Sequence, residues 1–299
     1  MTVRILQFGT TGQLARELLG QAKDFDVETT ALSRAEADFA DPAAVVAQLK
    51  AHPADLVVLA AAYTAVDQAE RERDLAFTVN AETPGAIAGA LGADGPALVQ
   101  ISTDYVFAGD KGAPYAPDDS TGPLNVYGAS KLAGEQAILA ACPRALILRT
   151  SWVVSAHGKN FVKTMLRAAG EGRALKVVDD QFGRPTAARD LARFILSQAS
   201  RLAAARAGDP VFGVHHFANT GEVTWKGFAD GVFTLAFGDK APAVASGATA
   251  DWPAPARRPM RGTLDTADLT AAFGVTPRPW REAVGEIVRE LQSEQRSAA

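Results

Sequence analysis

The feature that most constrains the fold is the start of the chain, where a short apolar strand runs directly into a glycine turn and a helix. Residues 4–8 (RILQF) have the composition of a strand, and residues 9–15 (GTTGQLA) form the turn that opens the helix. Glycines at such a corner let backbone N–H groups approach a phosphate at the positive end of a helix. We therefore predict a dinucleotide-binding corner around Gly9 and Gly12.

The next part of the chain repeats a strand and helix pattern. Apolar strands are predicted at residues 55–59, 97–101 and 145–149, with helical segments between them. Strands that alternate with helices form a parallel sheet covered on both faces. The predicted fold class is therefore α/β, a Rossmann-type doubly wound parallel sheet with a smaller C-terminal substrate-binding lobe. Ligands of such sheets bind at the carboxyl ends of the strands.

The residues after the second strand indicate the cofactor. This strand is expected to end near Leu32, about 20 residues after the glycines, where an acidic side chain would hold a ribose 2′-hydroxyl. Ser33 and Arg34 stand there instead, and a hydroxyl followed by a guanidinium suits a 2′-phosphate. NADPH is therefore the expected cofactor, with NADH left open. Asp38 and Phe39 are expected to border the adenine.

Beyond residue 151 the alternation becomes less regular, and residues 179–186 and 241–259 have the composition of loops. We expect residues 1–151, with returning elements at about 186–218, to form the NADP-binding Rossmann domain. Residues 152–185 and 219–299 are expected to form the smaller substrate-binding lobe.

The run Tyr127-Gly128-Ala129-Ser130-Lys131 offers a proton donor and a cation on one face of a helix, because residues four apart lie one above the other. A tyrosine has a pKa near 10, and a nearby ammonium is expected to lower it. Thr103 closes a neighbouring strand. These three residues form a triad for hydride transfer between nicotinamide and a carbonyl or alcohol carbon. Tyr127 would exchange the proton, Thr103 would hold the oxygen, and Lys131 would bond the nicotinamide ribose.

Composition excludes several classes of partner. A net charge of -4 and a pI of about 5.6 give no electrostatic footprint for nucleic acid. The chain shows no secretory leader and no apolar stretch that could span a bilayer, so we expect a cytoplasmic protein without a membrane partner. Cys142 is the only cysteine, which rules out an internal disulfide and a thiol metal cage, and the four histidines supply no metal site either.

The motifs resemble the extended branch of the short-chain dehydrogenase/reductase superfamily, and within it the dTDP-4-dehydrorhamnose reductase family. The resemblance rests on residues 102–107 (STDYVF), 123–135 (PLNVYGASKLAGE) and 149–153 (RTSWV), with further matches in order over nearly the whole chain. That family reduces the 4-keto group of dTDP-4-dehydro-L-rhamnose with NAD(P)H to make dTDP-L-rhamnose. The resemblance implies this activity and a small nucleotide-sugar substrate.

The resemblance also implies specific contacts. The residues that would touch the cofactor are Gly12, Gln13, Leu14, Asp38, Phe39, Ala62, Tyr63, Thr64, Tyr127 and Lys131. Thr103, Asp104 and Trp152 would touch the sugar nucleotide, since a carboxylate accepts hydrogen bonds from hydroxyls and an indole gives a deoxysugar a flat wall. Arg258 is expected to bind the diphosphate, because a guanidinium can fork onto phosphate oxygens.

Some members of this family hold a divalent cation with glutamates at a subunit interface. Glu17 and Glu290 match two of those positions, but the third is Arg189. A cation beside an added positive charge is disfavoured, so we predict that this protein lacks the metal. A homodimer stays open, and the dimer formed around that metal need not be shared.

Three alternatives remain. A nucleotide-sugar 4,6-dehydratase would need a glutamate after the Thr-Asp pair, and Tyr105 stands there. An epimerase would retain tightly bound NAD+. A non-catalytic, NADP-binding regulatory subunit like that of methionine adenosyltransferase would not need the triad, and the intact Thr103, Tyr127 and Lys131 favour an enzyme.

Overall fold

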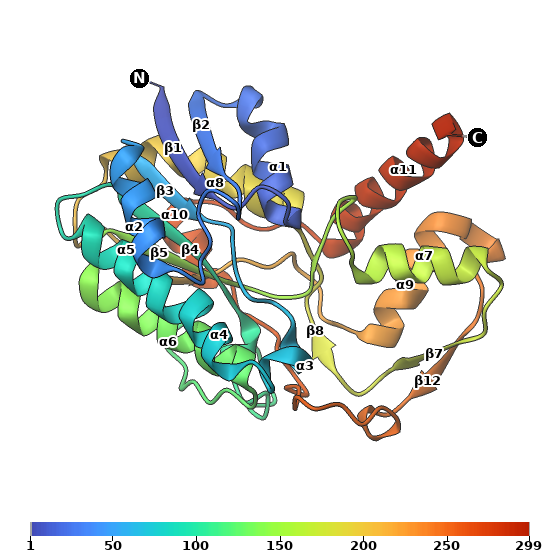
Figure 1. Ribbon diagram of the computed structural model, residues 1–299. Coiled ribbons are helices and arrows are strands. Elements are labelled where there is room, and N and C mark those ends of the chain that lie inside the picture. Colours follow the sequence, from blue (N-terminus) through green and yellow to red (C-terminus); the bar gives the residue numbers. More distant parts are fainter. Residues whose placement is uncertain (1, 299) are drawn as a thin grey trace.

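The structure is a computed structural model that describes residues 2–298. Its centre is a six-stranded, entirely parallel sheet in the order β10-β5-β4-β3-β1-β2 (Figure 1). The strands are β1 (Val3–Phe8), β2 (Val27–Leu32), β3 (Leu56–Leu59), β4 (Ala97–Thr103), β5 (Ala145–Thr150) and β10 (Gly213–His216). The predicted α/β, Rossmann-type sheet is confirmed. Because chain order reverses between β1 and β3, a ligand crevice is expected at their carboxyl ends.

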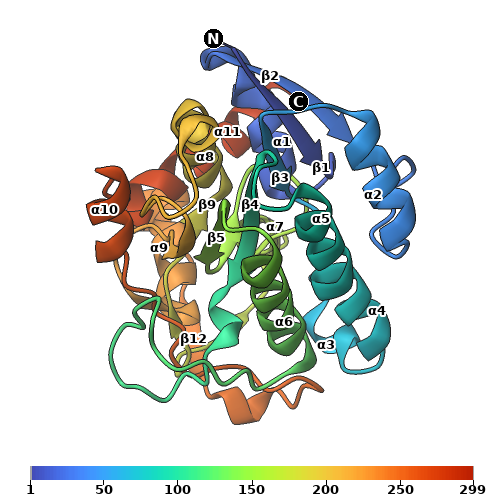
Figure 2. The same ribbon diagram turned by 90° about the vertical axis from the view of Figure 1, so that its left-hand side faces the viewer.

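Helices cover both faces of this sheet (Figure 2). One face carries α1 (Gln13–Gln21), α8 (Ala188–Ala204) and α10 (Ala267–Phe273), and the other carries α2 (Pro42–Ala51), α5 (Thr83–Leu91) and α6 (Val126–Ala141). Successive strand residues enter opposite cores: Ile5 packs on the α8 side and Leu6 on the α5 side. Burial on both faces explains why the central strands β3, β4 and β5 are mostly apolar runs.

A second hydrophobic core lies beside the sheet, to its right in Figure 1. It is built from α7 (Phe161–Gly170), α9 (Trp225–Phe237) and α11 (Trp280–Ala298), with β7 (Leu175–Val178) paired to β12 (Val244–Gly247). Two further short pairs are β6 (Val153–Val154) with β9 (Thr186–Ala187), and β8 (Phe182–Gly183) with β11 (Val223–Thr224). Two short helices, α3 (Val66–Ala69) and α4 (Arg73–Phe77), lie between β3 and α5 in the chain.

The two predicted loops are partly strands. Residues 179–186 include β8 and the first residue of β9, and residues 241–259 include β12. These strands are two to four residues long and pair with distant segments, so no local periodicity marks them. Within residues 2–298, none of the helices combines the length and apolar character needed to cross a membrane.

Candidate functional site

The glycine turn lies at the point where strand order reverses. Gly9, directly after β1, has a φ of +104°, and a Cβ built on it would lie 3.1 Å from the Ala61 nitrogen at the end of β3. Only glycine fits that approach without strain. Gly12 is the N-cap of α1, so the backbone donors of the helix end face the same corner. The turn has the shape and exposed donors that a dinucleotide diphosphate requires.

A cavity of about 420 Å³ opens on the β2 side of this turn. The predicted cofactor residues that line it are Gly9, Gly12, Arg34, Asp38, Phe39, Ala62 and Tyr63. The Arg34 side chain is 81% exposed, with Nε 3.2 Å from Asp38 Oδ2. Ser33 donates its hydroxyl to Glu36 at 2.7 Å instead of lining the cavity. Of the two residues predicted to meet a 2′-phosphate, only Arg34 lines this cavity, and its role there stays a prediction.

A second cavity, of about 630 Å³, opens on the other side of the turn. The predicted residues that line it are Gly12, Gln13, Leu14, Ala62, Thr64, Thr103, Asp104, Tyr127, Lys131 and Trp152. Gly12 and Ala62 line both cavities, so the two meet at the glycine turn. The predicted catalytic residues thus share one space with residues of the cofactor corner.

Helix α6 supplies Tyr127 and Lys131 from its first turns. The Asn125 side chain caps this helix by accepting a hydrogen bond from Gly128 N at 2.8 Å. Lys131 is 2% exposed, and burial lowers its pKa to about 8 although Glu135 acts in the opposite direction. Glu135 is itself held by Arg149, 2.7 Å away at the end of β5. The lysine is therefore buried, with the Glu135–Arg149 ion pair near it.

The expected lowering of the Tyr127 pKa is corrected by the structure. Burial raises its pKa to about 12, the neighbouring Thr103 side chain opposes that rise, and Asp104 adds to it. Desolvation disfavours the phenolate more than the surrounding groups favour it. Tyr127 is therefore protonated at neutral pH, which is the state needed to donate a proton to a carbonyl oxygen.

Asp104 is a buried carboxyl group with one unused oxygen. It is 3% exposed, and Thr103 Oγ1 donates a hydrogen bond to Oδ1 at 2.9 Å. Within the described chain Oδ2 has no hydrogen-bond partner. Burial raises the pKa of Asp104 to about 7, against the hydrogen bond from Thr103. A carboxyl group of this kind is ready to bond a ligand hydroxyl.

Asp104 should also make stability depend on pH. Its pKa in the folded protein lies above the ordinary value of 3.8, so its contribution to stability is present below about pH 4 and is lost as pH rises through about 7. We expect Asp104→Asn to raise the melting temperature relative to wild type more at pH 8 than at pH 5. Calorimetry of both proteins at both pH values checks this. An equal difference at the two pH values would contradict it.

Trp152 is held by an aromatic partner that the sequence analysis did not single out. Its φ of +46° makes it the only non-glycine residue with positive φ among residues 2–298. The ring stacks on Trp225 with centroids 3.6 Å apart and planes 11° from parallel. A Cβ at Gly183 would lie 2.5 Å from the Trp152 ring, so the indole is fixed from a second side. Such strain persists only where the surroundings hold it, which favours a functional wall.

Trp225 lines the larger cavity and begins α9, directly after its capping residue Thr224. A tryptophan in the first turn of a helix is too weak a sequence signal to indicate this role. Arg258, in contrast, lies on a separate cavity of about 570 Å³ that also borders Trp225. Its guanidinium bonds Asp67 at 2.7 and 3.1 Å. Its predicted role at the diphosphate stays a prediction.

Known proteins match nearly the whole chain in sequence. The family model described as the RmlD substrate binding domain matches residues 3–293. The chain is 40% identical over 298 residues to the dTDP-4-dehydrorhamnose reductase of Sinorhizobium fredii, covering 99% of this chain and 100% of that protein. It is 42% identical over 303 residues to that of Burkholderia thailandensis, covering 98% and 100%.

Solved structures agree. The crystal structure of dTDP-4-dehydrorhamnose reductase from Bacillus anthracis, described as a complex with NADP, is similar with a TM-score of 0.89 and 33% identity, covering 97% of this chain and 100% of that one. The family model spans nearly the whole chain, and the relatives are about 40% identical to it, so both comparisons indicate the same family. The chain belongs to the dTDP-4-dehydrorhamnose reductase family.

Proposed function

We propose that this protein reduces the 4-keto group of dTDP-4-dehydro-L-rhamnose to give dTDP-L-rhamnose, with NADPH as the reductant. Family membership makes it an NADP-dependent oxidoreductase of dTDP-rhamnose synthesis. The observation that carries the proposal is one cavity in which Thr103, Asp104, Tyr127, Lys131 and Trp152 surround a space next to the glycine turn.

Each residue has a defined part in this reaction. NADPH, when bound, supplies the hydride for C4 of the sugar. Tyr127 gives its proton to the O4 oxygen, and Thr103 holds that oxygen. Lys131 lies one helical turn from Tyr127 and lines the same cavity, where it would bond the nicotinamide ribose, and its pKa of about 8 would let it share a proton near neutral pH. We assign Asp104 to a sugar hydroxyl and Trp152 to the face of the sugar ring, because both residues line the cavity.

The residues around the glycine turn fit NADPH. Gly9, Gly12, Gln13 and Leu14 would lie along the diphosphate and nicotinamide, while Phe39, Ala62 and Tyr63 would enclose the adenosine. Ala62 and Thr64 come at the carboxyl end of β3, where cofactor passes close to backbone. Arg34 supplies the charge that distinguishes NADPH from NADH, with Asp38 and Ser33 beside it.

Arg34→Ala should weaken NADPH use selectively. We expect the KM for NADPH to rise roughly 10-fold while the KM for NADH stays within about 2-fold, since a charged hydrogen bond to phosphate is lost. Steady-state kinetics with each cofactor measures this. Arg173→Ala, at another exposed arginine far along the chain, is the matched control and should change neither. Equal changes for both cofactors would remove Arg34 from 2′-phosphate recognition.

The structure also separates this reaction from that of a dehydratase. Tyr105 occupies the position after Asp104, its ring meets Tyr127 edge-on at 5.8 Å, and burial raises its pKa. Because its pKa is raised, the Tyr105 phenol stays protonated at neutral pH, so it is a poor base for removing a carbon-bound proton. An epimerase or a non-catalytic NADP-binding subunit would show no NADPH consumption with the keto sugar.

The direct test is to follow NADPH absorbance with enzymatically generated dTDP-4-dehydro-L-rhamnose. Stoichiometric oxidation with formation of dTDP-L-rhamnose is expected. An NADPH absorbance that does not fall when the keto sugar is added would overturn the assignment in favour of the alternatives. Bound NAD+ that survives purification would do the same.

Three wider features belong to the same proposal. We assign cofactor binding to residues 1–151 with 186–218 and substrate binding to residues 152–185 with 219–299. The separate core of α7, α9 and α11 supports this division, whereas α10 departs from it, because Leu269 and Phe273 pack in the core of the sheet. The protein is expected to work in the cytoplasm on a soluble nucleotide sugar. A homodimer stays open, and light scattering of the purified chain tests it.

A further inference from the structure

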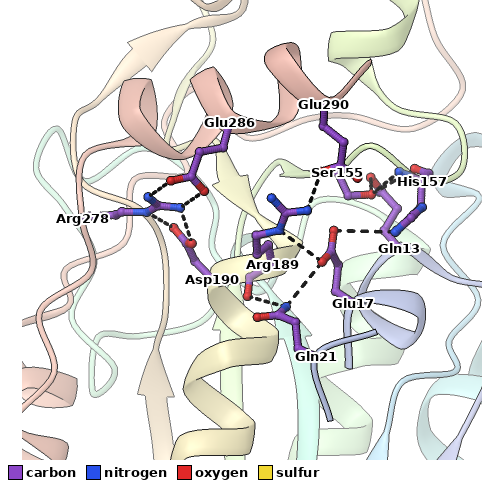
Figure 3. Close-up of polar contacts among 10 residues, drawn as sticks. All are labelled: Gln13, Glu17, Gln21, Ser155, His157, Arg189, Asp190, Arg278, Glu286 and Glu290. Carbon is purple, nitrogen blue, oxygen red and sulfur yellow. Dashed lines mark hydrogen bonds and ion pairs between the residues drawn. The ribbon is translucent and has the colours of Figure 1, made fainter. Parts of the chain in front are cut away.

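Charged side chains of α1, α8 and α11 meet in one cluster (Figure 3). Arg189, in the first turn of α8, lies between Glu17 of α1 and Glu290 of α11. Its Nε is 3.6 Å from Glu17 Oε2, and its Nη2 bonds Glu290 Oε2. The two carboxylates come from opposite ends of the chain, so one guanidinium ties the two termini of the fold together.

Glu17 is the group that makes a cation necessary here. It is 4% exposed, and its Oε1 has no hydrogen-bond partner among the described residues; His157 Nε2 lies 4.0 Å away. Burial raises the pKa of Glu17, Glu290 adds to this, and Arg189 and His157 oppose it. A buried carboxylate of this kind is costly without a positive partner.

A divalent cation, as implied by the family resemblance, does not fit this cluster. Such ions take about six or more oxygen ligands, and here the guanidinium stands between the two carboxylates. The neighbouring Asp190 and Glu286 are both bonded by Arg278, at 2.6 to 2.9 Å. Across residues 2–298, no group of three or more His, Cys, Asp and Glu side chains is arranged to hold a metal ion.

We propose that Arg189 is the resident cation of this junction and makes the protein independent of divalent cations. The guanidinium supplies the charge that joins α1 to α11 within one chain. Two further hydrogen bonds hold α1. Gln21 Nε2 donates to Arg189 O at 3.1 Å, and Gln13 Nε2 donates to Val153 O at 3.1 Å. Helix α1, which opens at the glycine turn, is thereby tied to α8, to α11 and to the start of the second core.

Two substitutions at Arg189 test this by thermal unfolding of the full chain in EDTA and in MgCl₂, MnCl₂ or CaCl₂, with ionic strength matched by NaCl. Wild type should melt at the same temperature with and without divalent cations. Arg189→Met should melt a few degrees lower, without rescue by any cation. Arg189→Glu would place a third carboxylate between Glu17 and Glu290, so it should melt lowest in EDTA. It should then gain about 3 °C or more at a cation concentration ten times the Kd.

Arg16→Glu is the matched control, because it introduces the same charge change at an exposed position of α1 beside Glu17. It should show no cation-dependent gain. A wild-type protein stabilised by Mg²⁺, Mn²⁺ or Ca²⁺ would overturn the proposal. So would an Arg189→Glu variant that responds to these ions no more than Arg189→Met does. None of these readouts depends on the proposed catalytic activity.

Discussion

Tyr127→Phe is expected to lower turnover of the keto sugar by at least ~100-fold, because a positioned general acid contributes about that much or more. The substitution removes only the phenolic hydroxyl and keeps the ring that meets Tyr105 edge-on. Cofactor binding and folding should therefore survive. Stopped-flow NADPH oxidation measures the rate, and fluorescence titration measures the NADPH Kd, which should change by less than about 3-fold.

The matched control is Tyr63→Phe. Tyr63 lies on the adenosine side of the turn, and its hydroxyl donates to Glu72 at 2.7 Å, away from Thr103 and Lys131. Its turnover should stay within a few-fold of wild type. Turnover of Tyr127→Phe close to that of this control would remove Tyr127 from the proton-transfer step.

Arg149→Met is expected to lower the free energy of unfolding by about 3–5 kcal/mol, since it leaves the Glu135 carboxylate buried without its partner. Arg149 and Glu135 are 5% and 2% exposed, and the guanidinium also donates to Pro117 O at 3.0 Å and lies over the Phe107 ring. This pair joins β5 to α6, the helix that carries Tyr127 and Lys131. Urea unfolding at pH 7 measures the loss.

Arg4→Met is the control for the same residue change in an exposed ion pair. Arg4 bonds Asp55 at 2.8 Å, but the two side chains are 53% and 36% exposed, so water replaces the lost contact. Its unfolding curve should be close to wild type. An Arg149→Met curve that matches it would show that the buried pair does not stabilise the fold.

The sheet could be predicted because its central strands β3, β4 and β5 are mostly apolar runs separated by helices of ordinary length. The glycine turn could be placed because Gly9 and Gly12 stand directly between an apolar strand pattern and a helical pattern. Both signals are local. The short strands of the second lobe could not be predicted, since β8 and β11 are two residues each and exist only through pairing across the chain.

The meeting of Thr103, Tyr127 and Lys131 in one cavity was predictable in outline, since the four-residue spacing of Tyr127 and Lys131 defines one helical face. The direction of the Tyr127 pKa was not, because it depends on burial, which composition and spacing do not reveal. The stack of Trp225 on Trp152 depends on two segments far apart in sequence meeting in space. The same holds for Arg189, whose opposing charge was visible in the sequence but whose position between Glu17 and Glu290 was not.

We expect the cavity around Tyr127 to bind a nucleotide sugar whose carbonyl carbon receives hydride from NADPH. The most direct measurement uses NADPH deuterated at C4 of the nicotinamide, on the transferred face, with dTDP-4-dehydro-L-rhamnose, followed by NMR of the sugar product. We expect one deuterium at sugar C4 for each NADPH oxidised. A product without deuterium at C4, or with deuterium at another carbon, would contradict it.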